Sequence, residues 1–218
     1  MRYYLKKYFI KWYVNRLKNS KFCIFSNDCW AGEIYKLSKR QFNTPFINLM
    51  IMAPCYLKLL ENPKTFLSYP LIFIPQSRYA EMNKINSGKA FPLATLGESG
   101  IEIHFLHYKN AEDAAKAWER RVKRIDWENV FVKFDCGKDY GDEEIANNIL
   151  NLPYKKILIF GSGNYLNEKI ISVRKYSNNA VTQFYNCFAE FNPFIWVKYG
   201  NIKAENLLEK TFRTFLFK

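Results

Sequence analysis

An alternation of strand and helix patterns between Gly100 and Phe160 constrains the fold more than any other feature. Its segments follow in the order strand 100–110, helix 111–123, strand 130–134, helix 142–150 and strand 157–160. Strands joined through a helix run parallel, and their crossover connections are right-handed. The sequence therefore predicts an α/β fold with three layers, in which a mostly parallel sheet carries helices on both faces.

The rest of the chain supplies further elements to the same fold. A strand at Phe22–Phe25 precedes a helical run at Glu33–Lys39, and the apolar stretch Thr44–Met52 reads as another strand. We expect the remaining elements as follows: helix Cys55–Glu61, strand Leu71–Ile74, polar loop Gln76–Lys89, strand Ala90–Leu96, strand Lys169–Lys175, and helix Lys203–Phe215 with Leu207, Leu208, Phe212 and Phe215 facing inward. No linker or repeat divides the chain, so residues 21–218 are predicted to form one domain.

Composition limits the class of protein. The chain has 218 residues, of which 49% are hydrophobic, and a formal net charge of +13. Such a chain buries a full core without disulfides, and its charge favours anionic partners. The five cysteines show neither paired nor zinc-type spacing, which indicates a reducing, cytoplasmic location.

Residues 1–18 combine six basic side chains with aromatic ones and contain no acid. Helical spacing brings Leu5, Phe9, Trp12 and Tyr13 near one another, as in helices that lie in a membrane interface. We treat residues 1–20 as a basic amphipathic helix that holds the protein peripherally on the inner, anionic face of the cell membrane. The alternative is a first helix packed on the domain with its charges in solvent. The segment has no signal-peptide pattern, and no apolar run is long enough to span a bilayer.

The stretch Lys21–Gly32, KFCIFSNDCWAG, is the strongest candidate for a site. A buried strand runs into the turn Ser26–Cys29, and a helix follows. In α/β proteins ligands bind at the carboxyl ends of strands, and a thiol near a helix N-terminus can become a nucleophile. Cys29 or Ser26 is therefore a candidate nucleophile. The alternative is that Ser26 and Asn27 cap the helix while Cys29 is a small buried side chain.

Polar groups follow three further predicted strands. If the strands are neighbours, a nucleophile, His107 and Asp135 converge in a Cys-His-Asp or Ser-His-Asp arrangement, with His104 as the competing histidine. The candidate substrate-binding residues are Asn27, Trp30, Gly32, Asn48, Tyr108, Lys109, Ser162 and Asn164.

Other common sites are not indicated. Gly161-Ser162-Gly163 is too short for a dinucleotide fingerprint, and the chain has no Walker motif and no HExxH motif. We therefore predict no metal site. We also predict no nucleic-acid partner, because no recognition motif accompanies the positive charge.

Several segments together resemble a known bacterial family. These are FSNDCWAG, TPFINLMI, IEIHFLHYKNAEDAAKAWERRVKRIDWENVFV and LPYKKILIF, between Phe22 and Val197. They are similar to a family described as exopolysaccharide biosynthesis protein, also known as domain of unknown function nineteen-nineteen. The resemblance implies a cytoplasmic α/β protein of capsule or lipopolysaccharide synthesis. Asp28 and Ala31 stand where relatives often have Asn and Gly, which makes these two side chains poor candidates.

The combined expectation is a transferase that modifies a cell-surface polysaccharide or its lipid-linked precursor. In the favoured version Cys29 or Ser26 attacks an acyl-coenzyme A donor, His107 acts as base and Asp135 orients it. One alternative is a glycosyltransferase that uses a nucleotide sugar and depends on Asp135. The other is a non-catalytic assembly protein docked to the membrane by residues 1–18. The sequence leaves the donor, the acceptor and the oligomeric state open.

Overall fold

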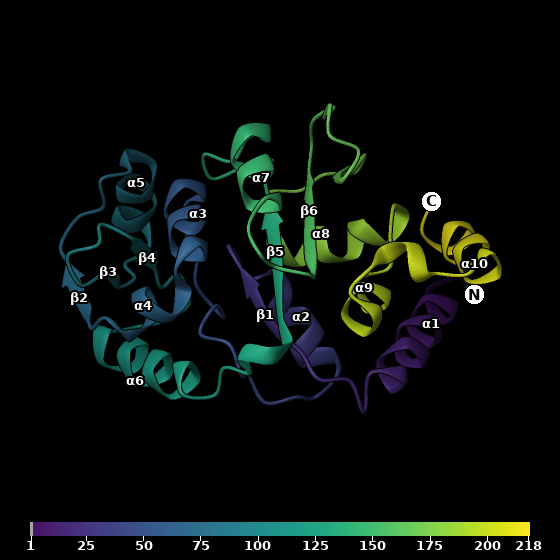
Figure 1. Ribbon diagram of the computed structural model, residues 1–218, viewed down its shortest axis with the longest axis horizontal. Coiled ribbons are helices and arrows are strands. Elements are labelled where there is room, and N and C mark those ends of the chain that lie inside the picture. The colour runs from purple at the N-terminus through teal and green to yellow at the C-terminus, as the bar shows by residue number, and fades with distance from the viewer. Residues whose placement is uncertain (1) are drawn as a thin grey trace.

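The computed structural model describes residues 2–218, and Met1, the first residue of the predicted membrane segment, lies outside the described residues (Figure 1). The strands are β1 (Cys23–Ser26), β2 (Leu71–Ile74), β3 (Leu93–Leu96), β4 (Glu102–His104), β5 (Val130–Asp135), β6 (Ile157–Gly161) and β7 (Ile170–Ser172). The helices are α1 (Arg2–Arg16), α2 (Trp30–Leu37), α3 (Ala53–Glu61), α4 (Pro63–Ser68), α5 (Ala80–Gly88), α6 (Ala111–Val122), α7 (Glu143–Leu150), α8 (Ala180–Asn186), α9 (Pro193–Tyr199) and α10 (Leu207–Phe217). None of these helices is long and apolar enough to cross a bilayer.

A parallel sheet of four strands forms the middle layer, in the order β1-β5-β6-β7. Cys23 pairs with Val130, and Asp135 pairs with Phe160. Helix α7 connects β5 to β6, as the alternating pattern predicts. Because all four strands point the same way, the loops that follow β1, β5 and β6 lie along one edge of the sheet.

The two faces of this sheet are covered by different helices. Successive side chains of a strand point to opposite faces, so Phe25 and Phe134 join one hydrophobic cluster while Ile24 and Phe131 join another. The first cluster includes residues of α3, α6 and α7, and the second includes residues of α1, α2, α8, α9 and α10. The predicted α/β fold with helices on both faces and an N-terminal helix is confirmed.

A second, antiparallel sheet of β2, β3 and β4 lies beside the first (left in Figure 1). The sequence predicted strand Leu71–Ile74 with its observed bounds and a strand that includes Leu93–Leu96, but not that they form a separate antiparallel sheet. The expected strand 100–110 was therefore wrong in two respects. Only Glu102–His104 is a strand, and it pairs antiparallel with β3 instead of joining the parallel sheet.

Two more expected elements were wrong. Thr44–Met52 is irregular, because Asn48 takes a left-handed backbone conformation (φ 65°) that interrupts a strand. Gln76–Lys89 contains helix α5 where a loop was expected. This helix buries only Met82, so its polar sequence conceals the helical pattern.

Helix α10 turns the opposite face inward from the one expected. Leu207, Leu208, Phe212 and Phe215 are exposed, and the helix buries Arg213 and Leu216. The Arg213 guanidinium pairs with Glu205 and donates to the carbonyl of Phe188 (2.6 Å). A satisfied arginine thus takes an inward position, and the four apolar residues expected there face solvent.

Candidate functional site

The turn after β1 is tied to the end of β5 by Asn27. The backbone N–H of Asp135 donates to Asn27 Oδ1 (3.0 Å), and Asn27 Nδ2 donates to the carbonyl of Asp135 (3.3 Å). Ser26, also buried, donates to Asp28 Oδ1 (3.2 Å). Asp28 Oδ1 in turn accepts from the backbone N–H of Trp30 at the start of α2 (3.0 Å). The polar residues of this turn therefore hold two strand ends and a helix start together.

Five ionisable side chains meet at this edge of the sheet, and we call them the charge cluster: Asp28, Lys133, Asp135, Lys138 and Asp139. The ammonium of Lys133, which is fully buried, lies 2.7 Å from Asp28 Oδ1. Lys138 Nζ lies 2.9 Å from Asp28 Oδ2 and 3.9 Å from Asp135 Oδ2. Asp135 Oδ1 accepts from the hydroxyl of Tyr176 (2.7 Å) and from the N–H of Gly137 (3.0 Å).

The three carboxyls of the cluster differ in pKa. Burial raises the pKa of Asp28, but Lys133 and Lys138 more than offset that effect and hold it well below its ordinary value. Burial raises the pKa of Asp135, with Lys133 opposing and Asp28 adding to the rise. Burial raises the pKa of Asp139 to about 6, and the charges of Asp28 and Asp135 contribute. Three carboxyls thus face two ammonium groups, and Asp139 takes up a proton as the pH falls through about 6.

The loop that carries Asp139 has an unusual backbone. Asp139 and Tyr140 both have positive φ angles (56° and 63°), a conformation uncommon for residues other than glycine. The carbonyl of Asp139 accepts from Ala53 N–H at the start of α3 (2.9 Å). Oδ2 of Asp139 is buried and accepts no hydrogen bond from the described residues. Such strain and such an unsatisfied carboxyl oxygen are typical of functional loops.

Cys29 lies beside the charge cluster but is not an activated thiol. Its Sγ donates to the carbonyl of Leu49 (3.5 Å). Burial raises the pKa of the thiol to about 11, and the charge of Asp28 adds to the rise. A thiol with this pKa is almost entirely protonated at neutral pH.

His107 approaches the same segment as Cys29 without contacting it. Its backbone N–H donates to the carbonyl of Asn48 (3.3 Å), next to the Leu49 carbonyl that Cys29 contacts. The structure describes no hydrogen bond between Cys29 and either histidine. His107 is exposed, and burial together with the charges of Lys89 and Lys36 lowers its pKa. Lys36 and Lys89 thus lie near His107, and Lys36 is already paired with Glu33.

His104 belongs to a different, buried network. Its Nε2 lies 3.3 Å from both Ser77 Oγ and Glu102 Oε2. In a catalytic triad the carboxylate contacts the other ring nitrogen, but Nδ1 of His104 has no partner among the described residues. The ring is fully buried, so this network resembles a Ser-His-Glu triad in composition and not in geometry.

The remaining predicted residues fall into two groups. Trp30 and Gly32 are buried in α2, whereas Lys109, Ser162 and Asn164 are exposed on loops. Tyr108 is partly buried, and its hydroxyl accepts from Arg121 Nη1 (2.5 Å).

Sequence reasoning missed four of the five charge-cluster residues and named only Asp135. Lys133 carried a usable signal, because a lysine within the apolar strand pattern FVKF needs a buried carboxylate partner. Asp28 was set aside as a poor candidate, yet it is the partner of both lysines. The described residues include no group of three or more His, Cys, Asp or Glu side chains arranged to hold a metal ion.

Comparison with known proteins places the chain in a family. The model of a domain of unknown function, DUF1919, matches residues 1–200. The chain belongs to the DUF1919 family. A relative in Haemophilus influenzae (strain ATCC 51907 / DSM 11121 / KW20 / Rd), named only as an uncharacterized protein, is 28% identical over 155 residues. The match covers 69% of this chain and 68% of the relative.

This result corrects one expectation from the sequence. The resemblance implied a family of exopolysaccharide biosynthesis proteins, and that attribution was wrong. DUF1919 is described as a domain of unknown function, and the Haemophilus relative is uncharacterized, so neither connects the chain to exopolysaccharide synthesis.

The pKa of Asp139 predicts how stability depends on pH. A carboxyl whose pKa rises from 3.8 to about 6 on folding stabilises the native state below pH 4 and loses that contribution as pH rises through 6. Over the whole titration, the free energy of unfolding falls by about 3 kcal/mol, and roughly 1 kcal/mol of this decrease occurs between about pH 5 and about pH 8. Asp139→Asn removes the titrating carboxyl, so wild type loses stability between about pH 5 and about pH 8 and the variant does not. In urea denaturation, the free energy of unfolding of the variant relative to wild type should therefore rise by roughly 1 kcal/mol between these pH values. An equal difference at both pH values would contradict the assignment, and Glu128→Gln serves as the exposed control.

Proposed function

We propose that this protein is a transferase in which Asp139 is the general base and the donor carries a diphosphate. Asp139 accepts the proton of an acceptor hydroxyl, whose oxygen then bonds to the transferred group. The donor releases coenzyme A if it is an acyl-coenzyme A, or a nucleoside diphosphate if it is a nucleotide sugar.

The observation that carries this proposal is the state of Asp139. A pKa of about 6 makes the carboxylate the main form at neutral pH and a stronger base than an ordinary aspartate. Buried ion pairs contribute little net stability, so a cluster with three carboxyls and two ammonium groups is a costly way to stabilise a fold. Perturbed carboxyls at the carboxyl ends of parallel strands favour a catalytic role.

The surface around His107, which carries Lys89 and the Glu33-paired Lys36, supports an anionic donor. It lies beside Asn48, whereas Asp139 contacts Ala53. Five residues of extended chain span at most about 17 Å, so the two groups lie within the length of a donor that carries a diphosphate. Between them, Ile51 N–H donates to the carbonyl of Asn27 (2.9 Å), which keeps the segment against the turn after β1.

The version of the mechanism that uses Cys29 as nucleophile receives less support. Its thiol has a raised pKa and donates to a backbone carbonyl instead of to a base. Ser26 is fully buried and donates to Asp28. A carboxylate base that activates the acceptor directly needs neither residue as a nucleophile.

Single substitutions separate the two mechanisms. Asp139→Asn should lower donor turnover by about 10²-fold or more, because general-base catalysis contributes about 10²–10⁴. Cys29→Ala should keep turnover within a few-fold of wild type, and the wild-type rate should rise with pH through about 6. The measurement is release of free coenzyme A or nucleoside diphosphate from each donor class in the presence of a cell extract as acceptor source.

Glu128→Gln is the matched control for loss of an acidic side chain. Each donor that turns over should also raise the melting temperature of Asp139→Asn, which shows that the variant still binds it. Loss of turnover in Cys29→Ala with retention in Asp139→Asn would overturn the base assignment and favour the thiol.

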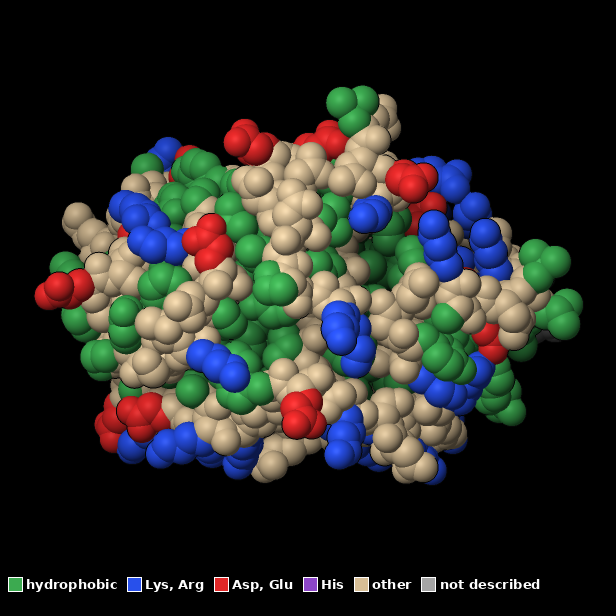
Figure 2. All heavy atoms as spheres, viewed as in Figure 1, with side chains coloured by type: hydrophobic (Ala, Val, Ile, Leu, Met, Phe, Trp, Pro, Cys, Tyr) green, Lys and Arg blue, Asp and Glu red, His purple; other side chains and the backbone are tan. Residues whose placement is uncertain are grey.

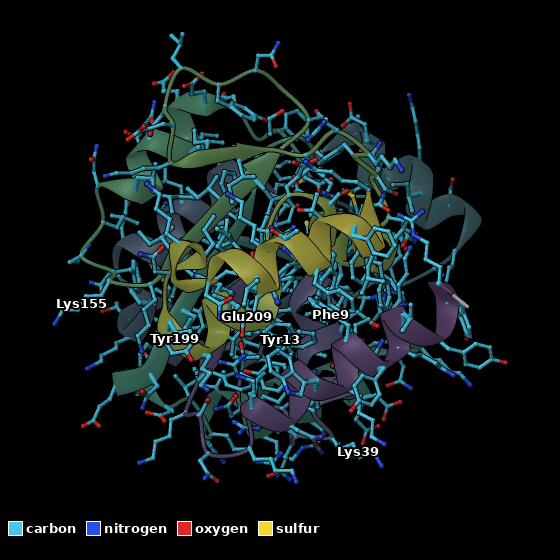
Figure 3. All side chains as sticks on the ribbon, turned by 90° about the vertical axis from the view of Figure 1, so that its right-hand side faces the viewer. Phe9, Tyr13, Lys39, Lys155, Tyr199 and Glu209 are labelled. Carbon is cyan, nitrogen blue, oxygen red and sulfur yellow. The ribbon has the colours of Figure 1, made fainter. Side chains whose placement is uncertain are left out.

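A second observation favours work at a membrane surface. Helices α1 and α10 lie side by side at one end of the molecule, with Phe9 and Tyr13 buried between them (Figure 3). Their outer faces form what we call the α1–α10 face, where apolar side chains protrude near basic ones (right in Figure 2). Its exposed apolar residues are Tyr4, Tyr8, Trp12, Leu207, Leu208, Phe212 and Phe215.

The charge on the α1–α10 face fits an anionic bilayer. The acids nearest α10 are taken by ion pairs, Glu209 with Arg16 and Glu205 with Arg213. Lys210 of α10 is exposed, as are Lys7 and Lys11 where the face meets the groove beside α1, and none of the three forms an ion pair in the described chain, so the face is cationic as well as apolar. Each basic residue near anionic lipid contributes about 1 kcal/mol to binding, and the apolar side chains add to it.

Vesicle sedimentation tests this docking. Wild type should bind vesicles that contain phosphatidylglycerol, and less strongly those of phosphatidylcholine alone, because the charge contribution is lost. Leu208→Ser/Phe212→Ser should weaken binding at least about tenfold, since it removes two apolar groups that enter the bilayer. The control Ile72→Ser/Ile85→Ser removes exposed apolar residues elsewhere and should bind as wild type. A wild-type dimer that Leu208→Ser/Phe212→Ser converts to a monomer would show that the face binds a second copy instead.

A further inference from the structure

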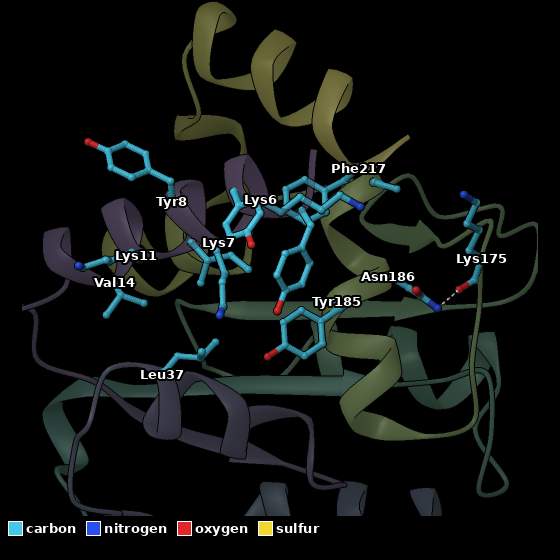
Figure 4. Close-up of a pocket in the computed structure, with 14 residues that line it drawn as sticks. Lys6, Lys7, Tyr8, Lys11, Val14, Leu37, Lys175, Tyr185, Asn186 and Phe217 are labelled. Atoms are coloured by element: carbon cyan, nitrogen blue, oxygen red, sulfur yellow. Dashed lines mark hydrogen bonds between the residues drawn. The ribbon is translucent and has the colours of Figure 1, made fainter. Parts of the chain in front are cut away.

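A groove of about 950 Å³ runs along the side of α1 that faces Leu37 and Tyr185, and its rim shares Tyr4, Tyr8, Lys7 and Lys11 with the α1–α10 face (Figure 4). Its volume lies at the upper end of the roughly 300–1,000 Å³ typical of ligand sites. Ile10 and Val14 of α1, Leu37 of α2 and Tyr185 of α8 form apolar walls. The groove is distinct from the charge cluster, because the two share no residue.

The groove is cationic where it meets solvent. Lys6, Lys7, Lys11 and Lys175 line it, and none of its described lining residues is acidic. The ammonium of Lys6 lies 5.0 Å from the centre of the Phe217 ring, and Lys7 extends toward Leu37 (Figure 4). Glu33 is the nearest acid that contacts the lining, 3.3 Å from the Tyr185 hydroxyl, and it is already paired with Lys36.

Like charges converge at the end of the groove where Lys6 lies. Burial lowers the pKa of Lys6, and the nearby charges of Arg2 and Lys175 lower it further. Arg2 donates to the carbonyls of Leu216 and Phe215, so carbonyl dipoles alone balance its charge there. A phosphate at this end would relieve the repulsion between the three cations.

We infer that this groove binds a lipid with a phosphate head group, whose hydrocarbon chain lies along α1 between Val14 and Tyr185 and whose phosphate contacts Lys6 and Lys175. The apolar walls suit a hydrocarbon chain, and the lysines at the rim suit an anion. This charge complementarity favours a phosphate-bearing lipid over an apolar peptide. The site adjoins the α1–α10 face and shares rim residues of α1 with it, but it needs no bilayer to be tested.

Binding of monomeric amphiphiles to the full chain tests the inference. Isothermal titration below micelle formation should give one dodecyl phosphate per chain. Inorganic phosphate, which lacks the chain, and dodecyl maltoside, which lacks the charge, should each bind at least about tenfold more weakly. Lys6→Ala/Lys175→Ala should weaken dodecyl phosphate about tenfold or more without filling the groove.

Two further variants complete the design. Leu37→Trp narrows the groove and should weaken dodecyl phosphate to a similar degree, provided that circular dichroism shows a native fold. Lys84→Ala/Lys123→Ala removes the same charge from exposed positions outside the groove and should bind as wild type. Leu208→Ser/Phe212→Ser, which tests bilayer docking, should also keep wild-type affinity for monomeric dodecyl phosphate.

Three results would overturn the inference. The first is equal affinity of wild type for inorganic phosphate and dodecyl phosphate. The second is wild-type affinity of Lys6→Ala/Lys175→Ala for dodecyl phosphate. The third is a loss of this affinity in Lys84→Ala/Lys123→Ala as large as in Lys6→Ala/Lys175→Ala. Failure of these tests would leave the assignment of Asp139 untouched, because the groove and the charge cluster share no residue.

Discussion

The buried ion pair between Asp28 and Lys133 is the interaction on which the rest of this structure depends. A lysine on a central strand with no solvent exposure requires a carboxylate within contact distance, and Asp28 supplies it from the end of β1. That requirement fixes the turn after β1 against β5. The same carboxylate receives Lys138 and the first N–H of α2, so a strand, a helix and the loop after β5 meet at one residue.

The electrostatics of the edge follow from this arrangement. Lys133 and Lys138 keep Asp28 ionised. Their positive charges also lower the pKa of the other two carboxyls, but not enough to offset the effect of burial. Asp139 lies on a strained loop and takes up a proton as the pH falls through about 6. The catalytic proposal rests on that protonation equilibrium. The lipid proposal rests on an independent imbalance, a groove with lysines and no acid of its own.

The sequence was informative where hydrophobic periodicity decides the structure. The alternation after Ala111 predicted α6, β5, α7 and β6, because in each element the apolar residues that recur with helical or strand spacing are the ones that it buries. Periodicity failed for α10, where buried Arg213 takes the inward position that an apolar residue was expected to fill. It also failed at Asn48, whose left-handed backbone ends a run that is apolar enough for a strand. The sequence predicted the turn between β1 and α2, but the electrostatics of this turn depend on Lys133 and Lys138, which contact Asp28 only in the folded chain.

A double-mutant cycle on Asp28 and Lys133 tests the central claim most directly. Asp28→Asn and Lys133→Met each leave one buried charge without its main partner, and each should lower the free energy of unfolding by about 3–5 kcal/mol. The double variant leaves neither charge of the pair and should cost much less than the sum of the two, as expected for coupled sites. Additive effects, or single substitutions that cost less than about 1 kcal/mol, would contradict the dependence of this edge on the Asp28–Lys133 ion pair.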